Sequence, residues 1–114
     1  VELLLELLQL FFEVIAEDRV LAVTVTAAGT TTLTIDSTQV QEFTGSTTHT
    51  VKLPTTSITA GMSYDIINNS SGTVTVQSSG ANTITTVAAG AMATFKAKQD
   101  APTTAAHWGY FTWS

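Results

Sequence analysis

Residues 63–77 read SYDIINNSSGTVTVQ, and this stretch carries the main signal for the fold. On both sides of the central NNSSG, apolar and polar residues alternate, which is the period of a β-strand with one buried face. Asn and Gly adopt left-handed backbone conformations at low cost. NNSSG therefore predicts a hairpin at 68–72 in which Gly72 has a positive φ angle and Ile66 and Val74 reach the same core.

The same alternation divides the chain after residue 19 into nine short segments, separated by Gly, Asn, Asp, Ser and Pro. No helical period recurs in this part of the chain, so the predicted fold class is mainly β. Regularly spaced turn signals predict an antiparallel β-sandwich or jelly roll of about eight to nine strands over 20–114, with one N-terminal α-helix. The predicted strands are 21–26, 31–35, 40–43, 48–53, 63–68, 73–77, 83–87, 92–98 and 108–113.

The first nineteen residues, VELLLELLQLFFEVIAEDR, have a different pattern and form a separate N-terminal segment, 1–19. Apolar residues recur there at alternating spacings of three and four, as at the a and d positions of a heptad. Further Leu, Phe and Val residues widen this face to more than half of the predicted helix. The predicted oligomer-interface residues are Val1, Leu4, Leu8, Phe11 and Ile15.

Three interpretations of this helix compete. A membrane span needs about 20 apolar residues, and four polar residues interrupt the first thirteen here. The helix could instead pack on its own β-domain, but a domain of this size has little surface for so wide an apolar face. The sequence favours a self-associating helix, in a homotrimer or among partner subunits, and no membrane span. A seam of two heptads is marginal alone, so the β-domain must help to hold the oligomer.

The composition limits the classes of function. Of 114 residues, 23 are threonine and only 11% are charged, so hydroxyl groups solvate much of the surface. The net charge is −5, but most of it comes from residues 1–19, and the remainder holds four acids and three bases. This nearly neutral body has no basic patch that would favour nucleic acid. The chain has no cysteine, so disulfides and thiol chemistry are excluded.

Residues suited to catalysis are few. His49 and His107 are the only histidines, and His49 lies within a predicted strand, where a structural role is the simpler interpretation. Asp36, Asp65 and Asp100 are widely separated, and turn or cap roles explain them better than paired acid–base chemistry. Nucleophile-elbow and phosphate-loop motifs are absent from the sequence. The prediction is therefore a non-enzymatic protein without a cofactor or metal.

The C-terminal strand contains both tryptophans of the chain. Alternation predicts Trp108 and Tyr110 on one face and Phe111 and Trp113 on the other. Large side chains with one polar group suit both subunit interfaces and sugar stacking. One set is expected in the core, and Trp108, Tyr110 and Trp113 are candidates for an interface or a ligand platform.

Several motifs between about 50 and 110 resemble one family. They are Leu53-Pro54, Ala60-Gly61 before Tyr64, IINNSSGTVTV at 66–76, SSGANTI at 78–84, AGAMATF at 89–95 and AAHWGY at 105–110. The chain thereby resembles the β-domains of tailed-bacteriophage tail-fibre, tail-spike and head-fibre proteins. The Asn-Asn-Ser-Ser-Gly turn is the most specific of these motifs.

The resemblance implies a β-sandwich component of the virion surface, commonly homotrimeric, and supplies no catalytic residues. The expected function is a structural one, as a fibre, collar or decoration protein that contacts other virion proteins. The alternative is a receptor- or glycan-binding module of a phage tail fibre, with a host surface glycan as its partner. In both cases the N-terminal helix is the expected assembly or attachment element.

Overall fold

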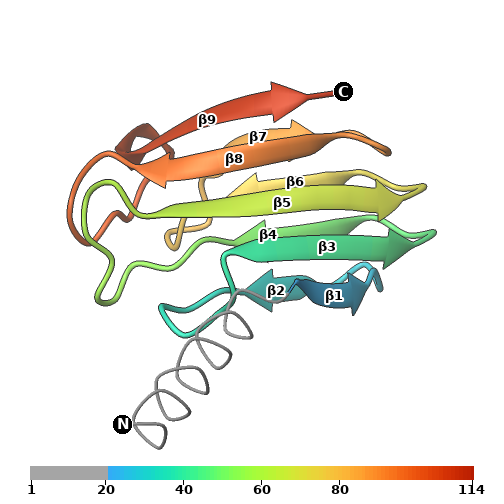
Figure 1. The fold of residues 1–114 in the computed structure, drawn as a ribbon, viewed down its shortest axis with the longest axis horizontal. Coiled ribbons are helices and arrows are strands. Elements are labelled where there is room, and N and C mark those ends of the chain that lie inside the picture. The colour runs from blue at the N-terminus through green and yellow to red at the C-terminus, as the bar shows by residue number, and fades with distance from the viewer. Residues whose placement is uncertain (1–20) are drawn as a thin grey trace, which may run out of the picture.

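Two β-sheets packed face to face make up the computed structural model, which describes residues 21–114 (Figure 1). The five-stranded sheet has the order β1 (Ala22–Val25), β3 (Val40–Gly45), β5 (Ser63–Ser70), β8 (Met92–Ala97) and β9 (Trp108–Trp113). The four-stranded sheet has the order β2 (Thr30–Thr32), β4 (His49–Lys52), β6 (Val74–Gln77) and β7 (Thr83–Val87). A 3₁₀ helix, η1 (Ala105–His107), precedes β9.

The mainly β class and the nine strands predicted from alternation are confirmed. The predicted helix at 1–19 and its interface residues Val1, Leu4, Leu8, Phe11 and Ile15 lie outside the described residues.

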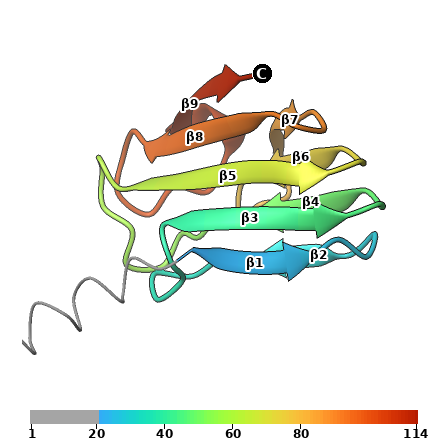
Figure 2. The same cartoon turned by 45° about the vertical axis from the view of Figure 1, so that its right-hand side comes forward.

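The prediction of purely antiparallel sheets is wrong. The strands β1, β3 and β5 are parallel neighbours, and so are β2, β4 and β6. The antiparallel pairs within residues 21–114 are β5–β8, β6–β7 and β8–β9. The chain passes from one sheet to the other after each strand from β1 to β5, so the pairs β1–β2, β3–β4 and β5–β6 form three two-strand coils that stack on one another (Figure 2). The strands β7, β8 and β9 then complete both sheets.

The NNSSG segment leads into one of these crossings and does not form a hairpin. Its first three residues end β5, and residues 71–73 connect β5 to β6, which belong to opposite sheets. The predicted positive φ at Gly72 is also wrong, because the glycines with positive φ in 21–114 are Gly45, Gly61 and Gly90. Gly72 is instead required for space: a Cβ atom there would come within 2.6 Å of the Thr47 carbonyl carbon, in the crossing of the preceding coil.

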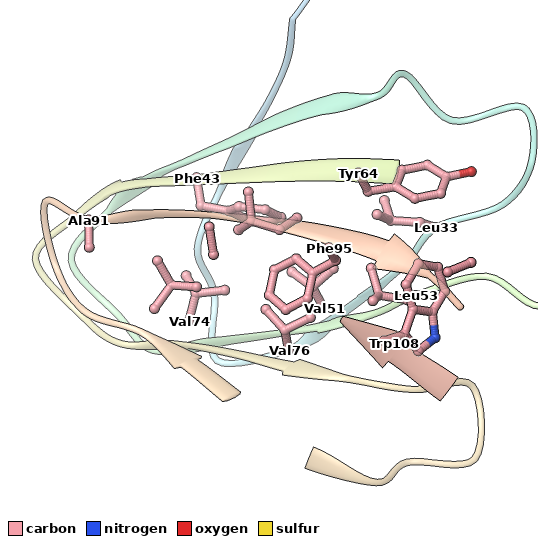
Figure 3. Close-up of a cluster of buried hydrophobic side chains, with 14 of the residues drawn as sticks. Leu33, Phe43, Val51, Leu53, Tyr64, Val74, Val76, Ala91, Phe95 and Trp108 are labelled. Carbon is pink, nitrogen blue, oxygen red and sulfur yellow. The ribbon is translucent and has the colours of Figure 1, made fainter. Parts of the chain in front are cut away.

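The core lies between the sheets and is built from the inward-facing residue of each alternating pair (Figure 3). Burying each large aliphatic or aromatic side chain contributes roughly 1.5–3 kcal/mol. Ile66 and Val74 share this core as the alternation predicts, although they reach it from opposite sheets. The largest fully buried apolar side chains are Phe43, Phe95, Leu53, Ile58, Ile66, Val51, Val74, Val76 and Val87.

One buried polar side chain links the crossing to both sheets. Asn68 points inward from β5, and its Nδ2 group donates to the carbonyl oxygens of Val87 in β7 (2.8 Å) and Gly72 (2.9 Å). Its Oδ1 atom accepts from the backbone N–H (3.1 Å) and the hydroxyl (2.5 Å) of Ser70. Because every polar atom of the amide is satisfied, Asn68 fixes the path of the crossing without an unpaired group in the core.

Candidate interaction surfaces

The outer faces of the two sheets have different chemistry. The four-stranded sheet carries a row of threonines in register across all four strands, Thr30, Thr50, Thr75 and Thr86. Large exposed apolar side chains gather instead on the edge strands of the five-stranded sheet, with Ile35 as the exception within 21–114. They are Leu21, Val23 and Val25 at β1, and Tyr110, Phe111 and Trp113 on β9.

The first group, which we call the β1 patch, consists of Leu21, Val23 and Val25. Strand β1 has the reverse of the usual pattern of a half-buried strand. Its larger apolar residues face outward, whereas Ala22, Thr24 and Thr26 face the core. Val23 is 57% exposed and Val25 is 68% exposed. The sequence shows the alternation at 21–26, but alternation alone favours burial of the apolar residues Leu21, Val23 and Val25 in the core. Sequence reasoning therefore missed the β1 patch.

The second group, which we call the β9 patch, consists of Tyr110, Phe111 and Trp113. The predicted alternation on β9 is confirmed: Trp108 and Tyr110 lie opposite the buried Ala97 and Phe95 of β8, whereas Phe111 and Trp113 lie on the outer face. Trp108 is only 3% exposed and belongs to the core, so of the three candidate aromatics only Tyr110 and Trp113 are accessible.

The β9 patch is internally ordered. The rings of Phe111 and Trp113 meet edge to face with centroids 4.9 Å apart, and they remain 60% and 45% exposed. The Tyr110 ring stacks on Phe95 at 6.0 Å and is half exposed, because β9 forms the edge of its sheet. Such aromatic pairs gain about 0.5–1.5 kcal/mol beyond their buried area, so the edge-to-face contact favours this arrangement of the two rings.

Charges of opposite sign accompany the two patches. Glu42 lies directly beside Val23 on the outer face of the sheet. Lys96 pairs with Gly109 of β9 on that face, and the Lys98 side chain lies close to Gly109. The β1 patch is therefore flanked by a carboxylate and the β9 patch by two ammonium groups.

His49 has a structural environment. Its Nδ1 atom accepts a hydrogen bond from the Ala27 N–H (3.4 Å), and its Nε2 atom lies 2.8 Å from the Thr31 hydroxyl. The ring also packs against Phe43, with centroids 5.4 Å apart. Burial lowers the pKa of His49 from its usual 6.5 because desolvation disfavours the charged imidazolium. The side chain thus ties the β1–β2 connection to β4 as a neutral ring.

The other candidate polar residues make hydrogen bonds that support local structure. His107 Nδ1 accepts from the backbone N–H groups of Thr103 (3.0 Å) and Thr104 (3.3 Å) at the start of η1. Asp100 lies in a bend and accepts from the Ala60 N–H of a neighbouring turn at 2.9 Å, in keeping with the expected turn or cap role. Asp65 differs from the expectation of a turn, because it lies within β5 and accepts from the Thr94 hydroxyl at 2.8 Å.

A groove of about 490 Å³ opens beside the ends of β2 and β4. Threonines, Leu33, Leu53 and Lys52 line it together with Ile35, Pro54 and Ser79, and its lining includes no carboxylate or imidazole. Within residues 21–114, His, Asp and Glu side chains form no group of three that could hold a metal ion. Helices in the same part of the chain are too short or too polar to cross a membrane.

The chain matches no known protein family, no curated protein and no solved structure.

Proposed function

We propose that this chain is a non-enzymatic structural protein of a tailed-phage virion, a homotrimeric fibre, collar or decoration component on the particle surface. In this proposal the segment 1–19 gathers the copies or attaches them to other virion proteins, and the β-domain projects outward. The resemblance of residues 50–110 to phage fibre domains supports the assignment to the class of virion structural proteins.

The observation that carries the proposal is the apolar surface of the two edge strands. Soluble monomers seldom expose contiguous groups of large apolar side chains, and such groups mark interaction sites. The β1 patch begins at Leu21, immediately after the amphipathic segment, so two surfaces suited to association are adjacent in the chain. A threonine-rich outer face on the opposite sheet fits the solvent-facing side of such an assembly.

Light scattering or sedimentation of the intact chain tests the oligomeric state, and a soluble monomer would refute the proposal. Deleting residues 1–17 should abolish assembly while circular dichroism still reports β-structure. If all structure is lost instead, the segment belongs to the core of the domain and the assembly role fails.

The register of the predicted helix has its own test. Replacing Leu8 and Phe11 together by Glu should dissociate the oligomer, because two unpaired carboxylates would be buried at several kcal/mol. The matched change of Glu6 and Glu13 to Gln should stay within about 0.5 kcal/mol per site, as expected for solvent-facing positions. Equal effects of the two pairs would contradict the predicted seam.

The second candidate is a receptor- or glycan-binding module, and the exposed pair of Phe111 and Trp113 favours it. Aromatic faces of this kind stack on sugars. Because Trp108 is buried and Trp113 exposed, a bound glycan should change the fluorescence of Trp113 alone. Titration of the parent and of Trp113→Phe with host-surface glycans checks this, and an identical response from both would exclude the site.

A further inference from the structure

The β1 patch and the β9 patch lie at the two opposite edges of one sheet (Figure 2). Four strand spacings of about 4.8 Å separate the edges by roughly 19 Å. Both edge strands have one side without a partner strand among the described residues. Open strand edges and exposed apolar side chains are each a liability that proteins usually cover.

We infer that the two patches are the two halves of one interface, in which the β9 edge of one copy of this chain packs against the β1 edge of the next copy. The inference rests on the proposed homotrimer and specifies how its β-domains meet. Such a contact is heterologous, because different surfaces of the two copies meet, and a heterologous contact closes into a ring when the rotation allows it.

Strand direction fits this arrangement. β1 is parallel to β3 and β5, β8 opposes β5, and β9 opposes β8, so β9 runs in the same direction as β1 (Figure 1). A rotation axis parallel to the strands preserves their direction in every copy. The β9 edge of one copy then meets the next β1 edge as a parallel neighbour, and all copies present Leu21 at the same end of the ring. The segments that precede Leu21 would enter from one side, as a shared bundle requires.

Charge supports a second copy as the occupant. Glu42 flanks the β1 patch from β3, Lys96 flanks the β9 patch from β8, and the Lys98 side chain lies near Gly109 of β9. Contact between the patches would therefore place groups of opposite charge on one outer face, two to three strand spacings or roughly 10–14 Å apart. The chain's own segment 1–19 is a poorer occupant, because it carries five acids and one base. Between the two patches it would meet the carboxylates of Glu42 and Asp65, and it would meet Lys96 and Lys98 only at the β9 side of the sheet face. A two-fold contact would pack the same patch of two copies against itself, with flanking charges of the same sign, and would leave the other patch uncovered.

The experiment uses the full chain and exploits the absence of cysteine. Ala27→Cys places one thiol just beyond β1, and Thr112→Cys places one on β9; both positions are exposed and lie outside the patches. The two variants are co-expressed with tags of different size and treated with a short bismaleimide. Thr86→Cys, exposed on β7 of the other sheet, replaces Ala27→Cys in the control.

A mixed Ala27→Cys/Thr112→Cys dimer, with no dimer from either variant alone or from the control pair, is the expected result. A chain with both cysteines should then give covalent trimers. Adding Val23→Thr and Val25→Thr, which preserve β-branched shape, should remove most of the mixed dimer while circular dichroism stays unchanged.

Cross-linking of one variant to itself would show a two-fold contact and overturn the inference. A trimer in solution without the mixed dimer would also overturn it, because the β-domains would then not meet at these edges and the proposed assembly through 1–19 would remain. A monomer in sedimentation would overturn both the inference and the proposed function.

Discussion

Replacing Gly72 by alanine should destabilise the domain even though Gly72 does not have positive φ. A Cβ atom would lie 2.6 Å from the Thr47 carbonyl carbon and 2.9 Å from the Thr48 nitrogen, well inside ordinary contact distance. Both obstacles are backbone atoms of the β3–β4 crossing, so no side chain can rotate away. On its other side Gly72 is held by Asn68, whose Nδ2 donates to the Gly72 carbonyl at 2.9 Å.

The expected magnitude follows from these contacts. Overpacking that shifts the backbone typically costs about 1–3 kcal/mol, and the smaller entropy of the unfolded alanine chain offsets about 0.4–1 kcal/mol of that. A net loss of roughly 1–2 kcal/mol should lower Tm by about 4–16 °C. Thermal melts followed by circular dichroism, with urea titration for the free energy of unfolding, measure it.

Two other glycines provide matched controls. Gly29 does not have positive φ and has no atom within 4 Å of a built Cβ, so Gly29→Ala should be neutral or slightly stabilising. Gly61 also has open space but a φ of +96°, so Gly61→Ala should lose about 1–3 kcal/mol through backbone strain alone.

Asparagine separates the two causes, because Asn tolerates the left-handed region better than Ala does. At Gly61, Asn should be milder than Ala, whereas at Gly72 Asn should be at least as damaging as Ala. If Gly72→Ala melts like the parent, or Gly72→Asn is clearly milder than Gly72→Ala, the steric argument is wrong.

Two further predictions concern buried polar groups. Asn68→Ala should lower the free energy of unfolding in urea by about 2–4 kcal/mol, because it removes four hydrogen bonds and leaves buried partners unpaired. The control Asn69→Ala, at an exposed position on the other face, should change stability by about 0.5 kcal/mol or less. Equal losses from the two variants would contradict the assigned hydrogen-bond network. His49 should make folding pH-dependent: its pKa is lower in the folded state than the unfolded value of 6.5, so below pH 6.5 the unfolded chain binds the proton more readily. Stability is therefore full above pH 6.5 and falls as the pH drops towards the folded pKa, and unfolding of His49→Gln at pH 7 and pH 5 should show a smaller fall than the parent.

Local sequence was enough to locate the strands. Period-two alternation and turn residues act over a few neighbours, so the nine strands could be found without any knowledge of their partners. The inward faces of β5 and β6, marked by Ile66 and Val74, were also evident, because a run of alternating apolar residues next to polar ones has one natural buried side.

Strand pairing, in contrast, depends on contacts between distant residues. NNSSG permits a tight reversal within one sheet, but it also permits a crossing to the opposite sheet, and both bring Ile66 and Val74 into one core. The parallel partner of β5 is β3, and their paired residues, such as Val40 and Asp65, are 25 positions apart in the sequence, so no local turn joins the two strands. The need for glycine at position 72 likewise comes from the nearby backbone of Thr47, and the local sequence around Gly72 does not predict that contact.

The sequence by itself determined a threonine-rich, nine-stranded β-domain behind an acidic amphipathic segment. Only the tertiary structure decided that β1 turns Val23 and Val25 outward, that β9 leaves Phe111 and Trp113 at the opposite edge, and that Trp108 is in the core. Alternation predicts that two sets of side chains lie on opposite faces of a strand, but packing against the other sheet determines which face is buried in the core. At an edge strand, which set of side chains faces the core also depends on the partner that covers the open edge.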